Sequence, residues 1–591
     1  MKKIFLMLTV ASVVITTSCK KFLDRKPLDG TSSTNFLTNE SEMDLGLNGV
    51  YAASFWQFPN NTPLLFDMET TTDLALRRVG NAEDQVAMGD GGPFLISNAL
   101  TVTAWGQAYK LVARANQQLS GMVKGQANVP VKTYGRLKAE ALVLRAWGYF
   151  HLMSLFGDVP YYREPLYANQ PFTLGRTPVA TIVNDLYKDM DEAVAAFDAA
   201  GTSAVQAMGK VNKGVALGLK AKLALLIKDY TTAAAAANSV IVTGNYGLNP
   251  RFTDLFVLAG QQSNVNREIM FNQTYPTDIL DPQNWLSVLT IPRQVTTSQS
   301  SHFPSQQLVD KFEGKDGLRI DASAVYDPAN PRLNRDNRLK WTVYMPGDTM
   351  VHNCAKSPSL PYTQPKERTI FNIYDNTVKK FNWNTGVFDT RTGNIDWIGY
   401  LASPWFAGAT GSSGGVGYVW RKYIDSTQYS WETKTGYILM RYADILLNYA
   451  EAKIELNQID GSVVNAINLV RTRAGQPTIA AGSQAQMRQM VRRERAVEFA
   501  GEGLRLYDLR RWGLVVAAMN GPVVGAAKDL VNVPATPAFD ANDIPNYSSS
   551  LSRRIATRGQ NRSNTSKHNL WPVPQGEIDK NPNLLPNNAG W

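Results

Sequence analysis

Residues 216–250 read "ALGLKAKLALLIKDYTTAAAAANSVIVTGNYGLNP", and this stretch determines the fold class. Apolar residues recur at steps of three and four on both sides of Asp229 and Tyr230, a pattern that predicts two amphipathic helices joined by a tight turn. The second helix is rich in alanine, and Pro250 closes the unit because proline cannot continue a helix. The stretch therefore predicts a pair of closely packed helices.

A second stretch, at residues 441–475, repeats this organisation with the sequence "RYADILLNYAEAKIELNQIDGSVVNAINLVRTRAG". Small residues such as Ala443 and Ala450 let helices approach closely, and leucines such as Leu446 and Leu456 fill the seam between them. Both stretches follow the pattern of a tetratricopeptide unit. Because they lie far apart in the chain, a compact helical scaffold with insertions is expected rather than a continuous solenoid.

Helical periodicity occurs in two blocks that are separated by a region of different composition. The blocks predict helices at residues 104–123, 131–156, 179–200, 211–228 and 231–243, and at 437–456, 462–474, 483–500 and from 504 onward. Residues 249–435 are instead rich in Pro, Gly, Asn, Thr and aromatics, with short runs such as "RLKWTVYM" at 338–345 that predict strands or irregular structure. The predicted fold is mainly α, a tetratricopeptide-like helical scaffold split by a loop-rich mixed region with short strands.

These patterns divide the chain into six segments. We expect a signal peptide at 1–18, a lipidated leader at 19–40, a helical portion at 41–248, a loop-rich and aromatic-rich portion at 249–435, a second helical portion at 436–520, and an extended segment packed on the body at 521–591. The last segment contains too many Pro and Asn residues for a regular helix or a central strand.

The N-terminus has the features of an exported lipoprotein. Lys2 and Lys3 precede roughly a dozen mostly apolar residues, which is the length of a signal-peptide core and is too short to span a bilayer. Small residues then lead to Cys19, as at a lipoprotein signal-peptidase site where the cysteine is acylated. An ordinary secretory cleavage site is the alternative. The only other cysteine is Cys354, so a lipidated Cys19 leaves no pair for an intramolecular disulfide.

Composition narrows the classes of partner. The chain of 591 residues has 44% hydrophobic and 19% charged residues, which is ordinary globular composition, and a formal net charge of +10. Such a charge favours nucleic-acid binding in a cytoplasmic protein, but an exported lipoprotein rarely meets nucleic acid. We therefore expect no nucleic-acid partner. Anionic surfaces or acidic ligands are the more natural partners, and a basic solvated surface is the simplest explanation.

Enzyme, metal and cofactor motifs are lacking in this sequence. Residues 411–415 formally fit G-x-S-x-G, but no apolar strand precedes them and no helical pattern follows. There is no H-E-x-x-H, zinc-type Cys/His spacing, EF-hand loop or P-loop. The sequence thus predicts no catalytic residues, no metal and no cofactor, with one alternative left open: a glycan-degrading enzyme that uses a pair of carboxylates.

A charged run and an aromatic run are interpreted as structural. In "MVRRERAVEFAGEGLRLYDLRRWG" at 490–513, arginines alternate with Glu494, Glu498, Glu502 and Asp508, which favours ion pairs within and between helices over nucleic-acid binding. The run "RAWGYFHLMSLFGDVPYYREP" at 145–165 predicts an aromatic helix that ends at a glycine and a proline.

These runs, together with "SCKKFLDRKP", "LMRYADILLNYAEAKIELN", "VRTRAG" and the terminal "WPVPQGEIDKNPNLLPNNAGW", resemble the SusD/RagB family in sequence and in order along the chain. The resemblance implies an outer-membrane lipoprotein that faces the exterior and has a tetratricopeptide-containing body. It also implies a SusC-like TonB-dependent transporter as partner, to which captured glycans, or in some members peptides, are delivered unchanged. In the family, ligand sites lie in variable loops, so no ligand residue is transferred by motif.

Ligand residues must therefore be chosen from the chemistry of the side chains. Sugar recognition uses flat aromatic faces together with planar polar groups that bond to hydroxyls. Seven of the thirteen tryptophans lie in the loop-rich portion, and we expect most to be core and one or two to contact ligand. A second patch at 70–98 contains charged residues that exposed salt bridges could also explain. The predicted ligand contacts are Asp73, Arg77 and Phe94 from this patch and Trp285, Trp397 and Trp405 from the loop-rich portion, with Asp73 and Arg77 joined to Trp285.

Overall fold

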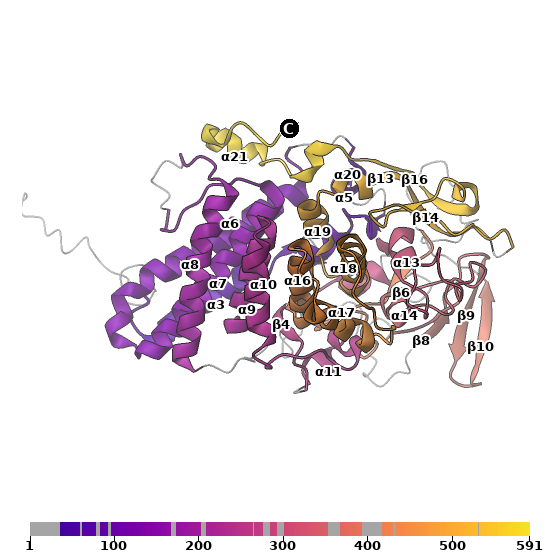
Figure 1. The fold of residues 1–591 in the computed structure, drawn as a ribbon, viewed down its shortest axis with the longest axis horizontal. Helices are drawn as coiled ribbons and strands as arrows, with labels where there is room; N and C mark the ends of the chain where they lie inside the picture. Colours follow the sequence, from indigo (N-terminus) through magenta and orange to yellow (C-terminus); the bar gives the residue numbers. More distant parts are fainter. Residues whose placement is uncertain are drawn as a thin grey trace, which may run out of the picture.

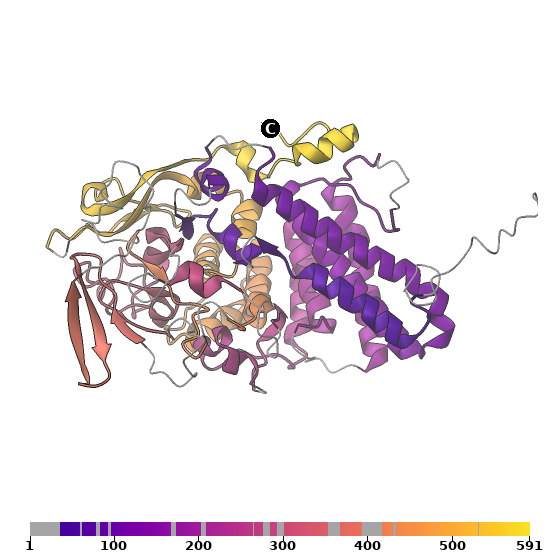
Figure 2. The same ribbon diagram turned by 180° about the vertical axis from the view of Figure 1, so that it is seen from behind.

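A computed structural model describes residues 36–58, 62–78, 83–92, 96–166, 173–201, 209–263, 265–275, 284–291, 301–352, 367–392, 416–428, 433–529 and 531–591. In Figure 1 the first helical group lies at one end of an elongated molecule. This group contains α3 (Glu40–Ser54), α6 (Ala99–Gly121), α7 (Val131–Phe156), α8 (Val179–Ala200), α9 (Lys213–Leu226) and α10 (Tyr230–Ile241). Each helix packs on the next in this order, and Figure 2 turns α3 and α6 toward the viewer.

Local sequence explains where these helices begin and end. The Asp229 carboxylate accepts a hydrogen bond of 3.0 Å from the Thr232 N–H, so the turn expected from the sequence is the N-cap of α10. Asn212 caps α9 in the same way through the Val215 N–H. Helix α8 ends at Gly201, whose φ of 64° is the left-handed conformation that glycine adopts without strain.

The second helical group packs directly on the first. It contains α16 (Tyr442–Glu455), α17 (Gly461–Arg473), α18 (Gln484–Glu498) and α19 (Arg505–Trp512), and α16 contacts both α9 and α10. The two tetratricopeptide-like stretches are therefore neighbours in space, at the centre of Figure 1. The chain between them leaves this junction and returns to it, as a scaffold with an insertion requires.

The helix predicted at 437–456 is wrong in its first turn. Residues Tyr437–Arg441 form strand β12, which pairs antiparallel with β4 (Ile269–Gln273). A short apolar run satisfies a helical and an extended pattern equally well, and the partner strand decides between them. This pairing brings together two segments that lie near the beginning and the end of the loop-rich portion.

The loop-rich portion contains short helices and small sheets. The strand or irregular structure predicted at 338–345 is wrong for its first part, which is helix α14 (Asn337–Thr342). The strand β6 (Val343–Tyr344) follows and pairs with β11 (Val419–Trp420). The Asp336 carboxylate caps α14 by accepting a hydrogen bond of 2.8 Å from the Arg338 N–H. An Asp at this position favours the start of a helix, but the residues that follow it in 338–345 are of types common in strands.

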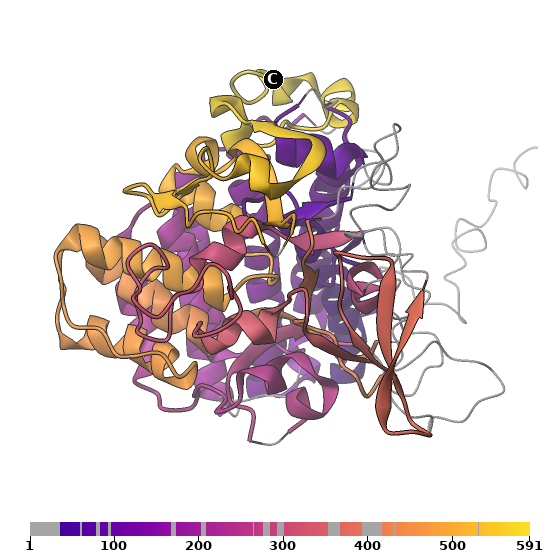
Figure 3. The ribbon, with the colours of Figure 1, turned by 90° about the vertical axis from the view of Figure 1, so that its right-hand side faces the viewer.

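One larger sheet stands out from this portion. Strands β7 (Thr349–His352), β8 (Glu367–Ile370), β9 (Thr377–Asn382) and β10 (Val387–Thr392) form an antiparallel sheet in the order β10-β9-β8-β7. The sheet lies at the end of the molecule opposite the first helical group (Figure 1), and Figure 3 shows the β9–β10 hairpin extending from the body.

The remaining α-helices and strands are short. They are β1 (Gln57–Phe58), β2 (Thr62–Pro63), α4 (Leu64–Glu69), β3 (Ala75–Arg77), α5 (Glu83–Asp90), α11 (Leu258–Gln261), α12 (Leu286–Thr290), β5 (His302–Pro304), α13 (Gln306–Lys311), α20 (Val515–Ala518), β13 (Asn520–Ala527), β14 (Ala538–Phe539), β15 (Pro545–Asn546), β16 (Arg554–Ser563) and α21 (Gln575–Lys580).

Ion pairs connect α18 with the loop-rich portion, as expected from the charged run, but they are buried. Glu498 accepts hydrogen bonds from Arg338 at 2.8 Å and from Arg441 at 2.6 Å, and all three side chains are fully enclosed. Burial alone raises the pKa of a carboxyl group, but arginines, among them Arg441 and Arg338, hold the pKa of Glu498 below its usual range. These ion pairs connect α18 with α14 and with β12.

The C-terminal segment packs across the body. Strands β13 and β16 pair antiparallel, and the Trp571 N–H donates to the Leu155 carbonyl at 2.8 Å. The Asn588 side-chain amide donates to the Phe156 carbonyl at 2.9 Å. The segment therefore satisfies carbonyls at the C-terminal end of α7 that have no partner within the helix.

Candidate ligand-binding site

The two charged residues predicted as ligand contacts lie in the core. Asp73 is 0% exposed, and its two carboxylate oxygens accept hydrogen bonds from Arg505 at 2.8 and 2.7 Å. Arg77 is buried and donates to Asp67 at 2.5 Å. Salt bridges do account for these charges, but the expectation that they are exposed is wrong, because strand β3 is enclosed by its pairing with β5. Burial leaves Asp73 no surface to offer a ligand.

The structure does bring the segments of Arg77 and Trp285 close together. Trp285 is half-buried at the start of α12, which contacts β5, the strand that pairs with β3. Contact of Trp285 with a ligand stays a prediction. Cys19, Phe94, Trp397 and Trp405 lie outside the described residues.

The other described tryptophans of the loop-rich portion divide into core and surface. Trp420 is 1% exposed, and Trp341 stacks on Phe252 with ring centroids 5.8 Å apart. Trp383 is 44% exposed. Of the described tryptophans only Trp420 is fully in the core, and Trp341 is half-buried against it, so the expectation that most are core is met in part. Trp383 lies at the edge of the projecting sheet.

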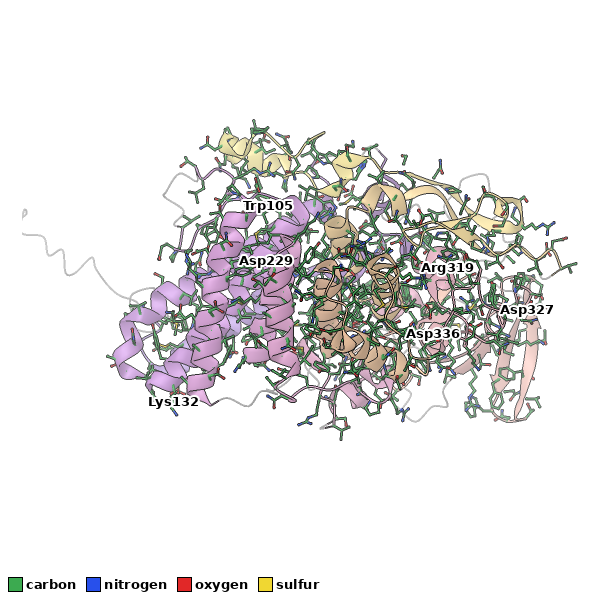
Figure 4. The ribbon with its side chains drawn as sticks, in the orientation of Figure 1. Trp105, Lys132, Asp229, Arg319, Asp327 and Asp336 are labelled. Atoms are coloured by element: carbon green, nitrogen blue, oxygen red, sulfur yellow. The ribbon has the colours of Figure 1, made fainter. Side chains whose placement is uncertain are left out.

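A pocket of about 490 Å³ lies beside this sheet, and we call it the loop pocket. Five parts of the chain line it: residues 328–332, residues 345–347, residues 370–379, Tyr418, and the stretch that contributes Ala526, Ala527, Asp529 and Val533. The side chains that offer polar groups or aromatic rings are Asn330, Arg332, Phe371, Asn372, Tyr374, Asp375, Lys379, Tyr418 and Asp529. Its first segment follows Asp327, which is labelled at the sheet end of the molecule in Figure 4.

Hydrogen bonds hold the walls of the loop pocket in place. Asp348 accepts from Arg332 at 3.0 Å and from the Met345 N–H at 2.7 Å, which ties two segments together. Gly347 has a φ of 92°, and the Arg332 guanidinium lies 3.1 Å from the position of a β-carbon there, so a larger residue meets both strain and crowding. The pocket is therefore organised before any ligand arrives.

Tyr374 supplies a half-buried aromatic ring with a neutral hydroxyl. Burial raises the pKa of Tyr374 to about 12, so its hydroxyl remains protonated at neutral pH. A neutral hydroxyl both donates and accepts hydrogen bonds, as sugar hydroxyls do.

One face of the projecting sheet continues from the loop pocket. Strand register places Arg368, Ile370, Thr377, Lys379, Phe381, Phe388 and Thr390 on the same side, and we call this side the aromatic face. Ile370, Thr377 and Lys379 also line the pocket. The pocket and the aromatic face therefore form one continuous surface.

Three aromatic rings cluster at the outer end of the aromatic face. Phe381 lies between Trp383, at 4.9 Å between ring centroids, and Phe388, at 5.3 Å. The Arg368 guanidinium lies over both Trp383, at 5.0 Å, and Phe381, at 5.3 Å. Flat apolar rings beside a planar cation are the groups that bind the C–H surfaces and oxygen atoms of a sugar.

Sequence reasoning did not single out this hairpin. The run "TVKKFNWNTGVFDTRT" at 377–392 alternates in side-chain character around Asn384, Thr385 and Gly386, which is a hairpin signal. Only the register, which pairs Phe388 with Phe381, reveals that these aromatics share an exposed face.

Two further observations limit the chemistry of the described residues. They contain no group of three His, Cys, Asp or Glu side chains arranged to hold a metal ion. In the described part of the chain, no helix has both the length and the hydropathy to cross a bilayer.

Comparison with known proteins identifies the family. The model of the SusD family matches residues 259–591, which is more than half of the chain, and a model described as "Starch-binding associating with outer membrane" matches residues 21–225. This protein therefore belongs to the SusD family.

Individual relatives are similar along nearly their whole length. SusD-like protein P2 of Formosa agariphila is 24% identical over 604 aligned residues, which cover 96% of each chain. A SusD-like carbohydrate-binding protein from Bacteroides fragilis superimposes with a TM-score of 0.72 at 24% identity, covering 93% of this chain and 99% of that one. Surface glycan-binding protein A from Bacteroides thetaiotaomicron superimposes with a TM-score of 0.63 at 16% identity, covering 94% and 100%.

Proposed function

We propose that this protein binds an oligosaccharide or polysaccharide on the surface formed by the loop pocket and the aromatic face, and that it does so without changing the ligand chemically. The observation that carries the proposal is the cluster of the exposed Trp383 with the half-buried Phe381 and Phe388, on a surface that continues into a polar pocket. A partly exposed aromatic cluster on a projecting hairpin does not stabilise the core, and its geometry suits the stacking of sugar rings.

The names of similar proteins support a glycan ligand. The Bacteroides fragilis and Bacteroides thetaiotaomicron neighbours are described as carbohydrate-binding and glycan-binding, respectively. Membership of the SusD family and the match to a starch-binding family model point the same way.

We further propose that Cys19 carries a lipid that anchors the protein to the outer membrane, with the body facing the exterior. The basic and apolar residues before Cys19 support export and acylation, and the second family model supports outer-membrane association. The partner in this proposal is a SusC-like TonB-dependent transporter that receives the glycan. Co-purification of a large β-barrel protein with this chain from detergent extracts tests the partnership, and repeated failure to recover one argues against it.

The proposed site predicts a specific loss of affinity. Trp383→Ala removes the most exposed ring of the cluster. We expect glycan binding to become less favourable by about 0.5–1.5 kcal/mol, which raises Kd roughly two- to tenfold. Isothermal titration calorimetry with the best ligand from a glycan panel measures the change.

The same hairpin offers a matched control. Val387 is 57% exposed and pairs with Asn382, which places it on the side opposite the aromatic face. Val387→Ala should leave Kd unchanged. Equal affinity of Trp383→Ala and the parent protein would exclude this cluster as the ligand surface. Shortened glycan products after prolonged incubation would contradict a purely binding function.

A further inference from the structure

The aromatic face has an uneven distribution of charge. Its charged members are Arg368 and Lys379, and the other described residues that the register places on this face are uncharged: Thr349, Val351, Ile370, Thr377, Phe381, Phe388, Thr390 and Thr392. Asp389 lies on the opposite face, where its carboxylate accepts from the Asn382 amide at 2.8 Å. The exposed aromatic surface is therefore cationic.

The two cations are available to a ligand. Arg368 and Lys379 are both exposed, and no carboxylate among the described residues lies within 4.0 Å of either charged group. The Arg368 guanidinium packs on the rings of Trp383 and Phe381. Because this contact uses a flat side of the guanidinium, the N–H groups along its edge can donate hydrogen bonds to a ligand. Lys379 stands where the aromatic face enters the loop pocket.

The loop pocket has carboxylates of its own. Hydrogen bonds from Thr377, with a smaller contribution from the Lys379 charge, lower the pKa of Asp375, so this carboxylate is ionised and partly offsets Lys379, whereas none of the described pocket carboxylates is paired with Arg368. Asp375 accepts from the Thr377 N–H at 2.7 Å and from the Thr377 hydroxyl at 2.5 Å. Asp529 accepts from the Val531 N–H at 2.9 Å. Asp348 is the acceptor of the Arg332 pair described above.

We propose that this surface selects an anionic glycan, with sugar rings stacked on Trp383 and Phe381 and with carboxylate or sulfate oxygens bound by Arg368 and Lys379. The inference rests on the proposed function and adds the chemical class of the ligand. Charge-assisted hydrogen bonds from a guanidinium are strong and directional toward planar carboxylates and toward sulfates. The net charge of +10 adds attraction at long range, which raises the rate of encounter with a polyanion.

The test compares three probes by isothermal titration calorimetry on the full mature chain at low salt: a neutral β-glucan oligosaccharide, an oligogalacturonate and a sulfated galactan oligosaccharide. We expect at least one anionic probe to bind roughly tenfold more tightly than the neutral one, with an affinity that falls as salt is added. The probe that binds distinguishes a sugar carboxylate from a sulfate ester.

Paired variants assign the selectivity to the two cations. The double variant Arg368→Gln/Lys379→Gln should lose roughly tenfold in affinity for the anionic probe and distinctly less for the neutral probe, which keeps only uncharged hydrogen bonds to these positions. Arg391→Gln is the matched control, because Arg391 is an exposed cation on the opposite face of the same sheet, paired with Val378. This control should bind like the parent protein. Thermal melts of all variants confirm that the fold is retained.

The outcomes separate this inference from the proposed function. Equal or tighter binding of the neutral probe overturns the anionic selectivity, and so does an unchanged affinity of the double variant for the anionic probe. Binding of the neutral probe alone, weakened by Trp383→Ala, overturns the inference and leaves the proposed function intact. Failure of every probe to bind counts against both.

Discussion

Buried ionisable residues fall into two kinds, paired and unpaired, and they affect stability differently. Glu498 is paired with arginines on several sides and its pKa is lowered, whereas Glu69 is 1% exposed and accepts a single hydrogen bond from the Gly501 N–H at 3.1 Å. Among the described residues, the second carboxylate oxygen of Glu69 has no hydrogen-bond partner. Burial raises the pKa of Glu69 to about 7, although Arg505 and Lys422 partly oppose this effect and Asp73 adds to it.

The raised pKa of Glu69 predicts that the free energy of unfolding depends on pH. The folded pKa of about 7 lies above the ordinary value of 4.5, so the folded state holds the extra proton between these values and the free energy of unfolding falls as pH rises through them. Glu69→Gln keeps a neutral acceptor for Gly501. Relative to the parent protein, we expect this variant to gain stability between pH 5 and pH 8, by up to about 3 kcal/mol.

Urea unfolding at a series of pH values measures the difference for Glu69→Gln. Glu40→Gln, at an exposed position at the start of α3, is the matched control for the loss of one carboxylate. A stability difference between Glu69→Gln and the parent protein that stays constant over this range would show that folded Glu69 is already ionised at pH 5, which contradicts a raised pKa.

The candidate site lies in the region that the sequence indicated, but its residues differ from those predicted. Trp383 is one of the seven tryptophans in 249–435, yet it was not among the predicted ligand contacts. Asp73 and Arg77 were chosen for their charge, yet Arg505, far away in the chain, encloses Asp73 in a bidentate pair. Such a partner cannot be inferred from one sequence, because nothing local to Asp73 specifies it.

The contact between α9 and α16 depends on a residue without a side chain. A β-carbon at Gly218 in α9 would lie 2.7 Å from the Met440 sulfur and 2.8 Å from the Ile445 Cδ1. Both are closer than van der Waals contact allows, so the two tetratricopeptide-like stretches meet at this distance because position 218 is glycine.

Enlarging this position should separate the two helical groups. We expect Gly218→Leu to lower the free energy of unfolding by about 1–3 kcal/mol, the usual cost of overpacking a core. Chemical denaturation measures the change. Gly106 in α6 is exposed, and a β-carbon there would meet no neighbouring atom, so Gly106→Leu should leave stability equal or slightly higher because leucine favours helix. Equal stability of the two variants would contradict a close contact at Gly218.

Elements with strong periodicity were predictable, and elements set by distant partners were not. The helices at 131–156 and 179–200 have the bounds expected from periodicity and from their flanking Pro and Gly residues. Strand β12 and the boundary between α14 and β6 were missed because their conformation depends on pairing with β4 and β11. Local sequence cannot report a strand partner that lies far away in the chain.

The molecule has its helical groups at one side and its candidate ligand surface at the far end. In the proposed function the lipid on Cys19 holds this body at the membrane, and the projecting sheet meets the glycan. Cys19→Ser removes the acylated thiol, so we expect the variant to move from the membrane fraction to the soluble fraction while keeping its glycan affinity. Cell fractionation followed by calorimetry measures both properties. Retention of the variant in the membrane fraction contradicts anchoring through this residue.

The most direct test of the central claim is amide hydrogen exchange of the full mature chain with and without its best glycan ligand. A bound glycan should slow exchange in residues 328–332 and 367–392, which form the loop pocket and the aromatic face, while the helical groups remain unchanged. Protection confined to other segments, such as those around α12 and Trp285, would contradict the proposed ligand surface.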